Sequence, residues 1–184
     1  MAQWKRILNF LCFQSGWFAC AFGAARGYPV VGPVAVGTLL ILQVPLVPAP
    51  RRWVRFILLG MVTGWLLDSA LMNAGVLSFK RHGMILWMCP VWMAALWANF
   101  AGTLHLCLSW LRGRYGLACA LGLCGGPMAY YAGQRLGAMR LGDNLTMSLA
   151  VIAIEWGLVT PALVYLSAIG PLDGLTDATG TRAG

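Results

Sequence analysis

Apolar residues along this chain gather in long runs, and the segments between the runs carry most of the charged and turn-forming residues. A run of about 20 residues is long enough for a helix to cross the hydrocarbon core of a membrane, which is about 30 Å thick. Such a run with few charges predicts a transmembrane helix. The spans that we assign cover residues 7–25, 30–47, 56–77, 90–111, 117–134 and 147–169.

Two of the six predicted spans are less regular than the others. The span over 30–47 is short, and glycine and proline interrupt it, so a broken or re-entrant crossing is an alternative to a complete one. The apolar run around the fourth span begins at Met84 and would be about 42 Å long as a helix. We therefore expect either a tilted fourth helix or a separate interfacial turn that ends at Pro90.

The distribution of charge gives these spans an orientation. The chain has 13 Lys and Arg residues against 5 Asp and Glu residues, and its net charge is +8. With six spans, eight basic residues fall on the side of both termini and five on the other side. The positive-inside rule then predicts cytoplasmic termini. The basic residues lie in short clusters between apolar runs, so they do not indicate nucleic-acid binding.

Composition places the chain in the same class. Hydrophobic residues make up 60% of it and charged residues 10%, whereas soluble domains have about 45–50% and about 25%. We therefore predict an all-α, polytopic transmembrane bundle of about six spans. One domain covers residues 1–170, and the polar segment 171–184 is expected to be a disordered tail.

Two acidic residues lie inside the apolar runs, and they are the strongest candidates for chemistry. Asp68 is in the third span and Glu155 is in the sixth. An ionisable group within a membrane is costly, so it usually faces a partner or a wet cavity. Counting residues from the span ends places Asp68, Asn99 and Glu155 about 18 Å from the cytoplasmic side. His105 lies about 9 Å closer to that side than Asn99 and on another face of the helix.

These positions support two interpretations. In the functional one, Asp68, Asn99 and Glu155 line a polar cavity with His105 nearby, and a desolvated carboxyl group could carry a proton or act in acid–base catalysis. In the structural one, the same groups only tie helices together by hydrogen bonds. The sequence leaves both interpretations open.

The six cysteines and two histidines give no metal-binding motif. All six cysteines lie in apolar runs, and none of them forms a C-x-x-C pair. We therefore expect no metal site and no cofactor, with the cysteines acting as small apolar side chains.

Two stretches of the chain resemble a known family. The first is the tryptophan-rich pattern P-x-W-x-x-x-x-W-x-x-F-A-x-T-L from Pro90, and the second is G-P-x-x-Y-x-x-G-x-x-L-G-A from Gly126. Both are similar to the bacterial inner-membrane family catalogued as domain of unknown function 2878, and the similarity covers nearly the whole chain except the tail. The resemblance implies a multi-pass protein without an assigned reaction, so it provides no catalytic residue.

The second of these stretches also adds residues to the expected cavity. A glycine pair followed by proline can break a helix and expose backbone carbonyl groups, which lipid would not tolerate but a polar cavity would. We therefore expect the fifth helix to break near Gly126 and Pro127. We assign these two residues and Tyr130 to the cavity.

Three classes of function remain open. An enzyme or accessory factor of membrane-lipid metabolism would use Asp68, Glu155 and His105 on a lipid or another apolar substrate, although the chain has no nucleophile motif or phosphate-binding loop. A small proton-coupled transporter or channel would use the two carboxyl groups as proton carriers. A structural or assembly protein would use them only to hold helices together. All three have the bilayer as a partner, and each is compatible with a homo-oligomer.

Overall fold

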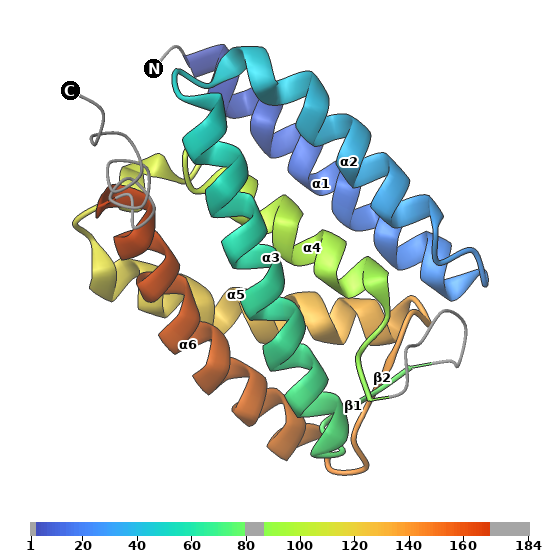
Figure 1. Cartoon of the computed structure of the whole chain (residues 1–184). Coiled ribbons are helices and arrows are strands. Elements are labelled where there is room, and N and C mark those ends of the chain that lie inside the picture. Colours follow the sequence, from blue (N-terminus) through green and yellow to red (C-terminus); the bar gives the residue numbers. More distant parts are fainter. Residues whose placement is uncertain (1–2, 80–86, 170–184) are drawn as a thin grey trace, which may run out of the picture.

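The computed structural model describes residues 3–79 and 87–169. Its described part is built from six α-helices (Figure 1): α1 Gln3–Ala25, α2 Val31–Gln43, α3 Pro50–Asn73, α4 Val91–Thr103, α5 Tyr115–Arg135 and α6 Leu145–Ile169. Short 3-10 turns follow α2 (η1, Val44–Leu46) and α4 (η2, Ser109–Leu111), and the strands β1 Leu77–Ser78 and β2 Arg140–Leu141 have two residues each. The predicted all-α class is confirmed. The expected tail lies outside the described residues.

The helices pack in three pairs, and α4 lies in the interior of the bundle. α1 packs on α2, α3 on α4, and α5 on α6, and α4 also contacts α1 and α2. α4 is correspondingly buried over most of its surface, with ten of its 13 residues inside the bundle. The long outer helices instead expose large apolar side chains, including Leu11 and Phe18 of α1 and Ile154 and Leu158 of α6. Such a surface suits contact with lipid.

Three helices, α1, α3 and α6, are long and apolar enough to cross a membrane. α5 has 21 residues, whereas α2 and α4 have 13 each, which is about 20 Å of helix. α2 continues into η1, so its apolar segment extends from Val31 to Leu46. The number of crossings and the side of the termini therefore remain predictions.

The fourth helix is shorter than the sequence predicts, because it ends at Thr103 and not near Leu111. The backbone N–H of Leu106 donates to the carbonyl of Thr103 (3.0 Å), and the N–H of Cys107 donates to Oδ1 of Asn9 on α1 (3.1 Å). The N–H groups of Leu106 and Cys107 thus have partners other than the carbonyl groups four residues earlier, to which they would donate in a continuing α-helix. α4 begins directly after Pro90, and residues 84–86 of the alternative interfacial turn lie outside the described chain.

A small antiparallel ribbon joins two helices at the far end of the bundle (Figure 1). Leu77 of β1 pairs with Leu141 of β2, directly after α3 and α5 respectively. Gly75 and Gly137 have φ angles of +77° and +81° at the ends of these helices, a conformation that glycine adopts without a steric penalty. The ribbon therefore holds the ends of α3 and α5 together.

Candidate functional site

Asp68 is the centre of a buried cluster that joins three helices. Its side chain on α3 is fully enclosed, with 0% of its surface exposed. Oδ2 accepts a hydrogen bond from the indole N–H of Trp97 on α4 (2.6 Å), and Oδ1 accepts one from the hydroxyl of Tyr130 on α5. Two donors suit an ionised carboxylate, because its oxygens only accept.

Glycines on α3 allow α4, with Trp97, to pack closely against α3 near Asp68. A Cβ atom at Gly64 would overlap the indole ring of Trp97, and one at Gly60 would lie 2.8 Å from the Cβ of Ala101. The two glycines precede Asp68 by one and two helical turns, so they lie on the same face of α3. Their small size brings α4 against α3 and the indole N–H within reach of the carboxylate.

An aromatic stack extends the cluster to α6. The rings of Trp97 and Trp156 are nearly parallel, with centroids 4.4 Å apart. Trp156 also contacts the edge of Tyr130, at a centroid distance of 6.2 Å, and it packs against Gly126 on α5, where a Cβ would overlap it. Gly126 therefore has a packing role in the cluster.

The predicted break in the fifth helix is not observed. α5 is continuous from Tyr115 to Arg135, with Pro127 inside it. A proline within a helix removes one backbone hydrogen bond and crowds the residue before it. Here that residue is Gly126, whose missing Cβ reduces the crowding, and close packing on α6 supports the helix. Pro127 therefore exposes no broken segment to a cavity.

Glu155 lies beside this cluster on α6. Both of its carboxylate oxygens are buried, and neither has a hydrogen-bond partner within the described residues. The group interacts electrostatically with Asp68 and with Tyr130. The structure therefore brings together the two acids that the sequence singled out, and Tyr130 lies at the same site.

Asn99 is directed elsewhere. Its side-chain amide donates to the carbonyl of Phe13 on α1 (2.8 Å) and lies against Gly16, where a Cβ would be 2.8 Å from Nδ2. Two residues along a helix differ by about 200°, so Asn99 and Trp97 point to opposite sides of α4. Asn99 therefore ties α4 to α1 and does not reach Asp68.

His105 is also separate from the acids. It lies beyond the end of α4, and its ring meets that of Phe56 edge-on with centroids 4.7 Å apart. Burial, together with the nearby charges of Arg112 and Arg52, lowers the pKa of His105 to about 4. The imidazole is therefore neutral at physiological pH and belongs to the arginine-rich end of the molecule.

Trp97 and Trp156 are the site residues that sequence reasoning missed. Most tryptophans near span ends fit an aromatic belt, but these two lie in the interior of apolar runs. A buried indole N–H needs an acceptor, and Asp68 was a candidate acceptor in the neighbouring span. That combination was the available signal for Trp97.

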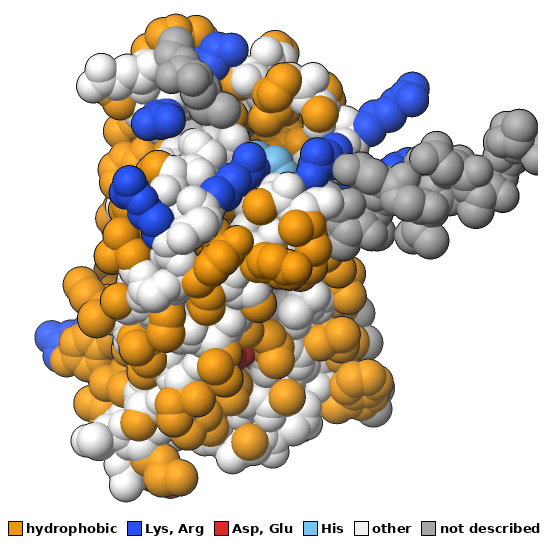
Figure 2. All heavy atoms as spheres, turned by 90° about the vertical axis from the view of Figure 1, so that its left-hand side faces the viewer, with side chains coloured by type: hydrophobic (Ala, Val, Ile, Leu, Met, Phe, Trp, Pro, Cys, Tyr) orange, Lys and Arg blue, Asp and Glu red, His pale blue; other side chains and the backbone are white. Residues whose placement is uncertain are grey.

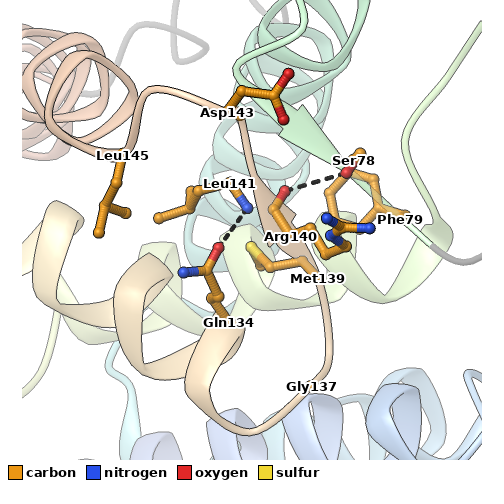
Figure 3. Close-up of a pocket in the computed structure, with 10 residues that line it drawn as sticks. Ser78, Phe79, Gln134, Gly137, Met139, Arg140, Leu141, Asp143 and Leu145 are labelled. Atoms are coloured by element: carbon orange, nitrogen blue, oxygen red, sulfur yellow. Dashed lines mark hydrogen bonds between the residues drawn. The ribbon is translucent and has the colours of Figure 1, made fainter.

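A separate open hollow of about 780 Å³ lies where α5 meets the ribbon. Figure 3 shows how its wall is held: Gln134 accepts the backbone N–H of Leu141 (2.7 Å), and the hydroxyl of Ser78 donates to the carbonyl of Arg140 (3.3 Å). Asp143 also lines this hollow. None of the predicted site residues is among its lining residues.

The buried cluster has the properties of a proton-binding group of side chains. Together with the adjacent Glu155 it contains two carboxyl groups and a phenol, and within the described chain neither acid is bonded to Lys, Arg or His. No three side chains of His, Cys, Asp or Glu gather in the described parts as a metal site would require.

Comparison with known protein families identifies a match for most of the chain. The model of a family described as "Protein of unknown function (DUF2878)" matches residues 6–162, which include every residue of the buried cluster. No curated protein and no solved structure matches the chain.

Proposed function

Since the chain belongs to the family of proteins of unknown function DUF2878, we propose its activity from the geometry of the buried cluster. The protein is a multi-pass protein of the bacterial inner membrane, with cytoplasmic termini and six helices in the bilayer. Asp68 and Glu155 bind a proton between the helices. The protein couples the movement of that proton to the passage of a solute.

The single observation that carries this proposal is that the carboxyl groups of Asp68 and Glu155 are both buried between apolar helices, near enough to interact electrostatically. Two negative charges that interact through a medium of low dielectric constant repel each other more strongly than they would in water. One shared proton removes this repulsion. Glu155 is the better holder of the proton because its buried oxygens have no donor among the described residues, whereas Asp68 has two.

Protonation of Asp68 would also change how the helices around it are held together. When Asp68 is ionised, its oxygens hold Trp97 of α4 and Tyr130 of α5 against α3. A proton on Asp68 turns one oxygen into a donor, and that oxygen then holds its present partner less well. The packing of α3 and α4 on α5 and α6 would thus depend on where the proton resides.

The first experiment measures the proton directly. We expect infrared difference spectra of the purified protein between acidic and neutral pH to contain a carbonyl band of a protonated carboxyl group. Glu155→Gln should remove that band, and Asp68→Asn should shift it. Asp143→Asn, which removes an exposed acid outside the cluster, is the matched control and should leave it unchanged. Absence of the band from the wild-type protein across this range would refute the proton-binding pair.

The second experiment tests coupling. Proteoliposomes with an entrapped pH dye should show proton entry when a solute extract of bacterial cells is added outside. Glu155→Gln protein that folds normally should lose this response. If the infrared band is present but no extract fraction moves protons, the transport step is wrong and only proton binding remains.

A role in membrane-lipid metabolism is the second candidate, because Glu155 is partly exposed as a residue, although its two carboxylate oxygens are buried, whereas Asp68 is fully enclosed. Figure 2 shows a largely apolar face with a small acidic area between apolar side chains. Once a lipid-soluble substrate displaces the side chains that cover these oxygens, the carboxyl group could serve in acid–base catalysis. Lipid profiles of a deletion strain distinguish the candidates: a change that wild-type protein reverses and Glu155→Gln does not would favour the lipid role.

A further inference from the structure

The open hollow at the ribbon adjoins the buried cluster. Gln134 lines the hollow and follows Tyr130 by four residues on α5, so both lie on the same face of the helix, about 6 Å apart along its axis. Met139 and Leu141 also line the hollow, and both pack in the same apolar core as Tyr130. A molecule in the hollow would therefore lie close to the helix face that carries the hydroxyl bonded to Asp68.

The wall of the hollow is fixed by the backbone. The N–H of Gly142 donates to the carbonyl of Val76 (2.9 Å), and a Cβ at Gly142 would lie 2.6 Å from the carbonyl oxygen of Gly75. The segment after β2 is therefore held against the segment after α3, in addition to the ribbon pairing. The volume of about 780 Å³ lies within the range of about 300–1,000 Å³ that is typical of small-molecule sites. The hollow thus has the size and the fixed wall of a preformed binding site.

Two opposite charges line the hollow without being paired. Arg140 belongs to β2, and Asp143 follows it by three residues. Figure 3 shows the carboxylate of Asp143 apart from the guanidinium group of Arg140, and neither side chain forms a hydrogen bond or an ion pair with the described residues. The start of α6 does not use Asp143, because Asn144 supplies the side-chain oxygen that accepts the N–H of Met147 (3.0 Å). Both charges therefore lack a partner in the part of the chain that the structure describes.

From this arrangement we propose that the hollow binds a small zwitterion, in which an ammonium group and a carboxylate or phosphate group lie a few atoms apart. The carboxylate of Asp143 would accept hydrogen bonds from the ammonium group, and the guanidinium group of Arg140 would donate two parallel hydrogen bonds to the anionic group. Phe79 and Leu145 line the same hollow and suit an apolar part of the ligand. A ligand with a single charge would leave one of the two protein charges without a partner.

This inference names the class of solute for the proposed proton-coupled transport, and in that respect alone it rests on the proposed function. The proposed topology places Arg140 and Asp143 on the outer side, so the hollow would receive the solute there. Binding itself requires neither Asp68 nor Glu155, and it is measured without a proton gradient.

The test measures how added compounds shift the unfolding temperature of the full chain in detergent, which rises when a ligand binds the folded state. Glycine, L-leucine and L-phenylalanine are the zwitterionic probes. Leucinamide carries only the positive charge, and N-acetyl-leucine carries only the negative charge. We expect at least one of the three amino acids to raise the unfolding temperature in a saturable way. Both one-charge compounds should bind at least about tenfold more weakly than L-leucine, since each lacks one charged hydrogen-bond partner.

Two substitutions in the hollow and one outside it show where the probe binds. Arg140→Gln and Asp143→Asn should each weaken the apparent affinity about tenfold, as expected for the loss of a hydrogen bond to a charged group. Both side chains are exposed, so these variants should fold normally. Arg135→Gln removes an exposed charge at the end of α5 that does not line the hollow, and it should change the affinity less than twofold.

A further arm identifies the source of the zwitterion. Stabilisation by phosphatidylethanolamine, lost in Arg140→Gln and not reproduced by the amino acids, would identify a lipid headgroup as the ligand. Equal stabilisation by L-leucine and its one-charge derivatives, equal losses in Arg140→Gln and Arg135→Gln, or no effect of any probe would each overturn the site. Asp143→Asn also separates the two proposals, because it should lose zwitterion binding and retain the infrared band of the proton-binding pair.

Discussion

At the scale of single residues, the buried carboxylate of Asp68 determines how its neighbours are arranged. Trp97 and Tyr130 come from different helices, and each donates its only side-chain hydrogen bond to this carboxylate. A buried acceptor that loses a donor retains its desolvation penalty without compensation. The cluster is therefore sensitive to the removal of a single hydrogen-bonding atom, even when the shape of the side chain is kept.

The first prediction concerns the hydroxyl of Tyr130. Tyr130→Phe should lower the free energy of unfolding by about 1–3 kcal/mol, because Asp68 loses a donor while the ring remains. Tyr131→Phe is the matched control: its side chain is 40% exposed, so the change should stay within about 0.5 kcal/mol. Chemical unfolding in detergent measures both. Equal effects of the two substitutions would contradict the role of the buried hydrogen bond.

At the scale of elements, glycines decide how closely the helices approach. Gly64 admits the ring of Trp97 to α3, and Gly126 admits that of Trp156 to α5. Both rings belong to the same stack, so two helix–helix contacts depend on one pair of indoles. In an apolar solvent such close contact is a main source of attraction between helices.

The second prediction compares two adjacent glycines of α5. Gly126→Ala should lower the free energy of unfolding by about 1–3 kcal/mol or more, because the new methyl group would overlap Trp156 in a packed interior. Gly125→Ala meets open space and should be neutral or stabilising by up to about 1 kcal/mol through better helix propensity. The difference in unfolding temperature is the measurement. A tolerated alanine at 126 would mean that the stack can shift and that its geometry is not fixed.

At the scale of the whole molecule, the pairing of helices sets the path of the chain through a membrane. Arg114 precedes α5 and Asp143 follows it, so the proposed topology places them on opposite sides. The positive-inside assignment puts residue 114 in the cytoplasm and residue 143 outside.

The third prediction follows from that placement. In a variant without native cysteines, Asp143→Cys should react with a membrane-impermeant maleimide in intact spheroplasts. Arg114→Cys should react only after the membrane is permeabilised. Labelling of both positions from the same side would show that α5 does not cross the bilayer.

The general architecture was predictable from sequence because long apolar runs with short polar breaks have few other solutions. The end of α4 was not, since the residues after Thr103 are as apolar as those before it, and the bond from Cys107 to Asn9 comes from another helix. Depth along each span suggested that Asp68 and Glu155 would lie together. It also suggested Asn99, because depth alone carries no information about which neighbour a helix face meets.

The ribbon of β1 and β2 has a mechanical consequence for any motion of the bundle. Its backbone pairing anchors the end of α3 to the end of α5, so these helices cannot slide or separate evenly along their length. Relative rotation would pivot at the ribbon, with the largest displacement at the opposite end. A small change around Asp68 would therefore be amplified with distance from the pivot, toward the turn that contains His105.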